Sequence, residues 1–269
     1  MPFKKLNILP LSPKKASLSP KKASLSPKKA SLSPKKASLS PKKASLSPKK
    51  ASLSPTSNID FHTQEEIDRY INNKLLNVKS NKKAIIMVGG PGSGKTSGIQ
   101  IVLNMNKKNL EDYVIVNPDD ILENFFNSDR TKYDKANIIN EQLYEKALKN
   151  NYNIIFDRTG TNFEVYYNNV ISKIKGKGYN VVLCIVYNNY TNVKDRIMER
   201  TAKTGRAVNE GYAKSSYRDL TFNIPKYINL NCQNVDEIFC FDNTSSSIEL
   251  IYRSKCINNE TIVSINNLI

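Results

Sequence analysis

The feature that most constrains this chain is a glycine-rich octapeptide with the spacing GxxxxGK[ST]. It follows the apolar run from Ala84 to Val88 and precedes a segment that can form a helix. Glycines at this spacing let successive backbone N–H groups turn toward phosphate oxygens, and the following helix presents its positive end to the same anion. The octapeptide therefore predicts a nucleotide-binding P-loop, made of Gly89, Gly90, Pro91, Gly92, Ser93, Gly94, Lys95 and Thr96.

Two residues of this loop have predicted roles toward a bound nucleotide, which is ATP or GTP. The Lys95 side chain is expected to reach the β- and γ-phosphates, and the Thr96 hydroxyl to ligate Mg²⁺. The loop does not identify the group that receives the phosphate, because kinases, motors, switches and helicases share it.

The rest of the chain after the tail alternates apolar, strand-like runs with helical segments, which is the pattern of an α/β fold. The run from Tyr179 to Tyr187 is apolar almost throughout, which indicates a strand buried on both faces and hence a parallel sheet. The predicted architecture is a three-layer P-loop NTPase sandwich with a mostly parallel sheet. Other strands are expected at 84–88, 113–116, 152–157 and 236–243, helices at 63–78 (packed on the sheet), 121–126, 132–150, 163–175, 193–200 and 209–220, and an edge hairpin at 248–252 and 261–265.

Charge is distributed unevenly and divides the chain into two parts. The chain has 269 residues and a formal net charge of +17, but 14 of its 41 lysines and arginines lie before residue 56, where there is no acidic residue. The remainder carries 27 basic and 24 acidic residues and is nearly neutral. We expect a basic tail at 1–55 and one P-loop domain at 56–269, with its core at about 80–255.

The tail contains six tandem copies of Leu-Ser-Pro-Lys-Lys-Ala-Ser, from 11 to 52. A proline every seven residues is incompatible with a coiled coil, so the repeat is expected to be disordered. Its Ser-Pro-Lys-Lys units resemble repeats in some linker-histone tails, which implies weak, salt-dependent binding to DNA or another polyanion. They also fit the target pattern of proline-directed kinases, and a solvated spacer is the remaining alternative.

Cysteine and histidine usage excludes several classes of site. The cysteines Cys184, Cys232, Cys240 and Cys256 lack CxxC spacing and are expected to be reduced and structural. The single His62 rules out a His-rich metal site or a serine–histidine hydrolase within the chain, so the chemistry has to use carboxylates, lysine and arginine. No apolar run is long enough to span a membrane, and a soluble intracellular protein of a eukaryotic or viral system is expected, in cytoplasm or nucleus.

Two adjacent carboxylates, Asp119 and Asp120, follow the second predicted strand. Ligands of open parallel sheets lie at the carboxyl ends of the strands, so one carboxylate is expected to face the γ-phosphate. In that position Asp119 can accept the proton of an attacking hydroxyl, while Asp120 caps the next helix. The alternative is that both residues only begin that helix.

A third carboxylate, Asp157, ends the third predicted strand, which is the usual Walker B position. It is expected to ligate Mg²⁺ through water or to hold the acceptor hydroxyl, and a simple strand-end turn is the alternative. The polar loop after it supplies predicted substrate contacts at Arg158, Thr159 and Asn162.

Arginines follow the longest predicted strand. Arg196 and Arg200 lie four residues apart on one predicted helix face, and Arg206 comes shortly after. Such arginines are commonly just a solvated face. Between two helices of a P-loop domain, however, they are expected to form a lid that neutralises the transferred phosphate. Arg200 and Arg206 are favoured over Arg196 for this role.

Taken in order, the motifs GGPGSGKT, VNPDD, NIIFDRTGTN and TGRAV, with a last strand ending FDN, resemble the zeta-toxin family of P-loop kinases. The resemblance implies ATP or GTP as donor and the 3′-hydroxyl of a UDP-linked N-acetylamino sugar as acceptor. It also implies a neutralising protein partner. By motif position it implies phosphate and magnesium roles for Lys95 and Thr96, a base at Asp119, a substrate contact at Thr159 and lid arginines at Arg200 and Arg206.

The pair Asp157-Arg158 departs from that family, whose UDP-sugar kinases carry Glu-Gly there. The strand-Asp-x-Thr loop is equally similar to polynucleotide 5′-hydroxyl kinases, but these carry an arginine where this chain has Leu122. The leading hypothesis is a small-molecule kinase that uses Mg²⁺. The alternatives are a polynucleotide 5′-kinase and, from another class, a nucleotide-dependent nucleic-acid-binding module without acceptor chemistry.

The tail hypothesis predicts that a chain without residues 1–55 loses weak retention on a DNA column but keeps its catalytic activity. The reason is that the repeats supply the twelve lysines that neutralise phosphates. Retention of the full and shortened chains at roughly 50 and 200 mM salt measures this. Equal retention of the two chains would contradict DNA binding by the repeats.

Overall fold

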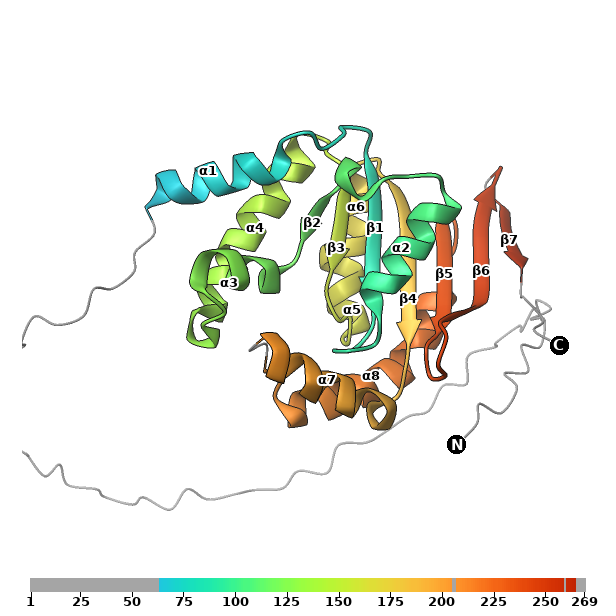
Figure 1. Ribbon diagram of the computed structural model, residues 1–269. Helices are drawn as coiled ribbons and strands as arrows, with labels where there is room; N and C mark the ends of the chain where they lie inside the picture. The colour runs from blue at the N-terminus through green and yellow to red at the C-terminus, as the bar shows by residue number, and fades with distance from the viewer. Residues whose placement is uncertain (1–62, 205–206, 259, 265–269) are drawn as a thin grey trace, which may run out of the picture. The chain divides into compact units, whose positions relative to one another are not determined.

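The structure, a computed structural model, describes residues 63–204, 207–258 and 260–264 (Figure 1). The predicted tail at 1–55 lies outside the described residues. Seven described strands form one sheet in the order β2-β3-β1-β4-β5-β6-β7. Their bounds are β1 Lys83–Val88, β2 Val114–Val116, β3 Ile154–Asp157, β4 Asn180–Tyr187, β5 Glu237–Asp242, β6 Glu249–Ile257 and β7 Glu260–Ser264.

The five strands from β2 to β5 in this order are parallel, which confirms the predicted sheet. Strand β1 lies in the middle, where Ile86 pairs with Phe156 of β3 on one side and Leu183 of β4 on the other. All three side chains are buried. The predicted edge hairpin is also present: β6 and β7 pair in antiparallel fashion and extend the sheet beyond β5.

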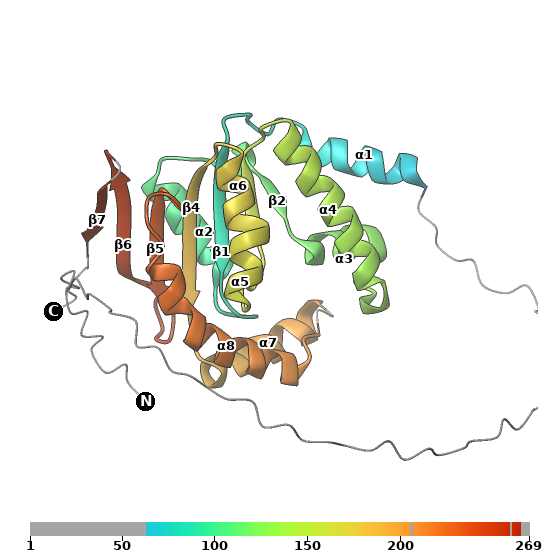
Figure 2. The same cartoon turned by 180° about the vertical axis from the view of Figure 1, so that it is seen from behind.

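Helices cover both faces of the sheet, as a three-layer sandwich requires. Helix α2 packs on one face through Ile99, Val102 and Leu103, whereas α4, α5, α6 and α8 cover the other (Figure 2). None of the described helices is long and apolar enough to cross a membrane. The bounds are α1 Gln64–Leu75, α2 Lys95–Met105, η1 Leu110–Asp112, α3 Pro118–Phe126, η2 Arg130–Lys132, α4 Tyr133–Lys149, α5 Phe163–Tyr166, η3 Tyr167–Ile171, α6 Ser172–Gly176, α7 Tyr190–Thr204 and α8 Glu210–Ile228.

Helix α1 begins with a capping box, in which Thr63 and Glu66 each accept the other's backbone N–H. Its buried residues Ile71 and Leu75 belong to the main core, but its nearest helical neighbour is α4 (Figure 1). The expectation that it packs directly on the sheet is therefore only partly right. Leu76, which lies within the predicted 63–78 helix, is 69 % exposed because α1 ends just before it.

Helix α8 extends past the predicted 209–220 segment to Ile228 although it contains Pro225. Proline normally ends a helix because it lacks an N–H group and crowds the preceding turn. Here Ile224 and Tyr227 lie in the core on either side of the proline, and the Tyr227 hydroxyl donates to the Gly160 carbonyl at 2.7 Å. Packing against the sheet thus overrides the local signal.

The prediction that all four cysteines are reduced is wrong for two of them. Cys184 of β4 and Cys240 of β5 are buried free thiols, as expected, but Cys232 and Cys256 form a disulfide. The fold brings these two residues together across 24 positions of sequence, a distance at which no short spacing motif gives a signal. The bond ties β6 to the loop between α8 and β5.

We predict that this disulfide stabilises the domain by roughly 3 kcal/mol, the value expected for a loop of this size. Thermal unfolding followed by circular dichroism should therefore shift down by roughly 6–12 °C when the protein is reduced. A C232S/C256S double variant is the matched control. Its unfolding midpoint should equal that of the reduced protein and should not change when reductant is added. An oxidised and a reduced wild type with the same midpoint would contradict the prediction.

Candidate active site

A cleft of about 1180 Å³ lies at the carboxyl ends of the parallel strands. The loops that leave β1, β2, β3 and β5 contribute to its walls, and helices α7 and α8 border it on the side where Figure 1 draws them below the sheet. Parallel strands place their ends at one edge, so polar residues that are far apart in sequence converge here. The cleft contains most of the predicted site residues.

The P-loop has the backbone geometry expected of a phosphate cradle. Gly92 and Gly94 adopt positive φ angles of 74° and 99°, which residues with a Cβ atom rarely adopt. Helix α2 begins at Lys95, so its first N–H groups point into the cleft. The Lys95 ammonium folds back and donates to the Gly89 carbonyl at 3.1 Å.

Two residues without a predicted role bind the P-loop backbone through hydrogen bonds. The Tyr217 hydroxyl of α8 donates to the Pro91 carbonyl at 2.6 Å, and the Asn243 amide after β5 donates to the Ser93 carbonyl at 2.7 Å. Gly90 lies against the Tyr217 ring so closely that a Cβ atom would come within 2.6 Å of it. The loop is therefore fixed by contacts with both neighbouring elements.

Asp157, which is predicted to be a Walker B residue, lies next to the P-loop lysine. Its Oδ1 atom is buried 3.8 Å from the Lys95 ammonium, and its Oδ2 atom accepts from the Asn117 amide at 2.9 Å. The exposed Thr96 hydroxyl lines the same cleft. A hydroxyl and a carboxylate are oxygen ligands that suit Mg²⁺. Among the described residues, no cluster of three acidic, His or Cys residues occurs.

Asp119 lies in the first turn of α3 and lines the cleft. The helix is capped by Asn117, whose Oδ1 atom accepts the Asp119 N–H at 2.9 Å. This corrects the expectation that Asp120 is the cap, and the reason is that α3 begins one residue earlier than the carboxylate pair, at Pro118. The Asp119 Oδ1 atom accepts from the Arg130 guanidinium at 2.9 Å.

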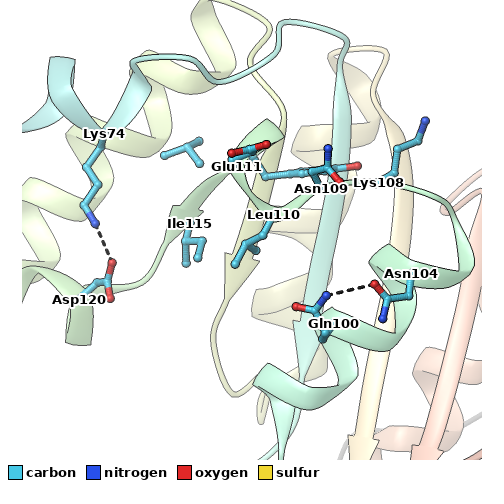
Figure 3. Close-up of a pocket in the computed structure, with 11 residues that line it drawn as sticks. Lys74, Gln100, Asn104, Lys108, Asn109, Leu110, Glu111, Ile115 and Asp120 are labelled. Atoms are coloured by element: carbon cyan, nitrogen blue, oxygen red, sulfur yellow. Dashed lines mark hydrogen bonds and ion pairs between the residues drawn. The ribbon is translucent and has the colours of Figure 1, made fainter.

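Asp120, in contrast, is occupied by an ion pair. Its carboxylate lies 2.9 Å from the Lys74 ammonium of α1, in a second hollow of about 590 Å³ beside edge strand β2 (Figure 3). Gln100 and Asn104 of α2 line the opposite wall and bond to each other. Asp120 lines both this hollow and the cleft. The two neighbouring carboxylates thus have different partners, and Asp119 is the one paired with a residue of the cleft.

The predicted substrate loop after β3 contributes two of its three residues to the cleft. Arg158 donates to the Asn137 side chain at 3.1 Å, and the Thr159 hydroxyl lies 3.4 Å from the hydroxyl of Tyr212. Asn162 is not among the residues that line the cleft, because its side chain caps α5. A helix start directly after a polar loop is a signal that would have indicated this role.

The arginines predicted to form a lid lie on α7, as far as the structure describes them, and α7 packs on α8 through a small cluster that includes Ile197 and Tyr217. Arg196 and Arg200 both line the cleft. Burial raises the pKa of the Tyr217 hydroxyl, and the two arginines oppose this rise only in part. Arg206 lies outside the described residues.

Three further residues line the far end of the cleft, and no sequence motif marks them: Arg130, Tyr133 and Tyr212. Burial and the nearby Asp119 carboxylate raise the pKa of the Tyr133 hydroxyl, although Arg158 opposes this. The hydroxyl therefore remains a hydrogen-bond donor at neutral pH. We refer to Asp119, Arg130, Tyr133, Arg158 and Tyr212 together as the acceptor end of the cleft.

Comparison with known proteins agrees with this fold. A family model described as "Zeta toxin" matches residues 67–255. No curated protein sequence matches the chain.

Among solved structures, a chain from the PezAT chromosomal toxin-antitoxin system of Streptococcus pneumoniae is similar, with 20 % identity over 71 % of this chain and 79 % of that one and a TM-score of 0.54. A chain of the AvrRxo1-ORF1:AvrRxo1-ORF2 complex has 13 % identity over 78 % and 72 %, with a TM-score of 0.57. The same complex with ATP gives 14 % identity over 76 % and 68 %, with a TM-score of 0.55. At these identities the likeness shows the fold.

The Asn117 side chain bonds both the Asp119 backbone and the Asp157 carboxylate, so its replacement should affect both helix α3 and Asp157. An N117A variant should lose about 1 kcal/mol of unfolding free energy, measured in urea, because α3 loses its cap. Its affinity for Mg²⁺-ATP should also fall by roughly tenfold, because Asp157 loses an orienting partner.

An N117S variant is the matched control, because serine can cap the helix but is too short to reach Asp157. We expect it to restore stability without restoring affinity, as measured by calorimetric titration. Recovery of both properties in N117S would show that the contact with Asp157 has no role in nucleotide binding.

Proposed function

The chain belongs to the zeta toxin family, and from this premise we propose that it is an ATP- and Mg²⁺-dependent kinase that phosphorylates a hydroxyl of a small-molecule acceptor. The observation that supports this most is that Lys95 and Asp119 line one cleft from the ends of two different strands. A kinase needs both a phosphate-binding cation and a base for the acceptor proton. ATP is proposed as donor because a similar structure is described as a complex with ATP.

In the proposed reaction the acceptor oxygen attacks the γ-phosphorus and its proton passes to Asp119. The bond between that phosphorus and the bridging oxygen breaks, and ADP leaves. Lys95 and Arg200 balance the charge on the transferred group, and Arg206 is proposed as a second lid arginine. Mg²⁺, held through Thr96 and Asp157, would neutralise the β- and γ-phosphate oxygens.

A UDP-linked amino sugar is the acceptor that membership of this family favours. Thr159, which lines the cleft beside Tyr212, is the proposed contact to it. The pair Asp157-Arg158 differs from the Glu-Gly of the family's UDP-sugar kinases, so the part of the acceptor next to β3 is proposed to differ as well. An inhibitory protein partner is also proposed, because a similar structure comes from a toxin-antitoxin system.

A polynucleotide 5′-hydroxyl kinase is the second candidate, and the arginines at the acceptor end support it. Arg130 and Arg158 both line this end, where a phosphodiester could bind. Leu122 is buried, so the helix position at which polynucleotide kinases carry an arginine contributes nothing to the cleft here.

The assignment of Asp119 as the base predicts that D119N lowers kcat by roughly 10²–10⁴-fold, because proton transfer to a positioned carboxylate contributes about this much. The dissociation constant of ATP should change by less than about threefold, since Asp119 is not part of the P-loop. Transfer of label from γ-labelled ATP and calorimetric binding of ATP measure the two quantities.

Asp120 provides the control, because it is adjacent to Asp119 in sequence but its carboxylate is paired with Lys74 of α1. We expect D120N to keep kcat within about threefold of the wild type. A D119N protein that is as active as D120N would refute the assignment of the base.

A further inference from the structure

The proposed base already has a cationic partner at the acceptor end. Arg130 donates to Asp119 Oδ1 at 2.9 Å, and both side chains remain about one-third exposed to the cleft, at 34 % and 29 %. A carboxylate has a second oxygen, and a guanidinium has further N–H donors. The ion pair can therefore stay intact while Asp119 contacts an acceptor hydroxyl and Arg130 contacts an anionic group.

A turn fixed by hydrogen bonds places Arg130 in this position. The chain leaves α3 through Asn127 and Ser128, which have left-handed φ angles of 47° and 65°. The Asp129 carboxylate then accepts the backbone N–H and the hydroxyl of Thr131, and these two bonds lower the pKa of Asp129. The single turn η2 follows from this cap and carries Arg130 at its first position.

A second arginine faces the same space. Arg158 is held by Asn137 at 3.1 Å and lies 5.9 Å from the centre of the Phe156 ring. Its Nε atom is buried without a hydrogen-bond partner among the described residues. A buried N–H group of a cation without an acceptor is costly, and an oxygen atom of a bound anion would satisfy it.

Charge at this end of the cleft is unbalanced. Among the described residues, three carboxylates line the cleft, but Asp120 is paired with Lys74 and Asp157 lies next to Lys95. Arg130 and Arg158 are left with Asp119, which pairs with Arg130 alone of these two. The Tyr133 hydroxyl adds a neutral donor close to both arginines. An acceptor that is only a neutral alcohol would leave these donors unmatched, whereas a phosphate group beside the hydroxyl would satisfy them.

We propose, on the basis of the proposed function, that Arg130 is a specificity-determining residue that selects acceptors carrying their own phosphate group next to the reacting hydroxyl. Arg130 binds this phosphate and at the same time orients the Asp119 carboxylate toward the hydroxyl. The shared chemistry is a hydroxyl compound with a phosphate monoester or diester, which includes nucleotide-linked sugars and nucleotides with a free hydroxyl.

The test uses the full chain and pairs of acceptors that differ by the phosphate: a UDP-N-acetylamino sugar against the free amino sugar, and a nucleoside 3′-monophosphate against the nucleoside. Wild type should use the phosphorylated member of the accepted pair at least about tenfold better in kcat/KM. R130A should lose this preference mainly through KM. R130K should keep part of the affinity but lower kcat, because a single ammonium cannot hold both carboxylate and phosphate.

K132A is the matched control, since it removes a cation from the same short turn at a residue that does not line the cleft. Its acceptor preference should equal that of the wild type. A wild type that uses both members of each pair equally, or an R130A protein that keeps the preference, would overturn the proposal.

Equilibrium binding separates this proposal from the proposed function. Calorimetry with the same compounds, without transfer, should show tighter binding of the phosphorylated member to wild type than to R130A. If no acceptor is phosphorylated but this difference is present, the kinase assignment fails and the anion site stands. If transfer occurs and the difference is absent, the proposal for Arg130 fails and the kinase assignment stands.

Discussion

The parallel pairing of β1 between β3 and β4 is the constraint on which the site depends. It brings the P-loop after β1 and Asp157 at the end of β3 to one edge, and β2 beside β3 adds Asn117 and Asp119. The Asn117 side chain then links these ends, because it bonds the Asp119 backbone and the Asp157 carboxylate at once. The positions of the proposed base and the proposed metal ligand are therefore coupled through one amide.

The cleft divides into two ends with different chemistry. At the P-loop, glycine backbone and Lys95 suit the phosphates of a nucleotide, while Tyr217 and Asn243 fix the loop from neighbouring elements. At the acceptor end, Arg130 and other side chains from three separate elements surround Asp119. A binding module without acceptor chemistry needs only the P-loop end. The presence of the acceptor end therefore favours the proposal of a kinase.

Strands, sheet type and P-loop could be predicted because each depends on a local pattern, either a continuous apolar run or a fixed spacing. The length of α8 could not, since buried Ile224 and Tyr227 outweigh the local effect of Pro225. The disulfide between Cys232 and Cys256 and the pair of Arg130 with Asp119 likewise depend on tertiary proximity. Such contacts join residues whose spacing has no fixed value, so no motif marks them.

The central claim is that the cleft transfers phosphate to a bound hydroxyl compound. Incubation of the full chain with γ-labelled ATP, Mg²⁺ and separate panels of UDP sugars, nucleosides with their phosphates, and 5′-hydroxyl oligonucleotides tests this most directly. We expect label to move to at least one hydroxyl acceptor that carries phosphate in wild type, and to do so at least about a hundredfold more slowly in D119N. Binding of ATP without label on any acceptor, or with release of inorganic phosphate alone, would contradict it.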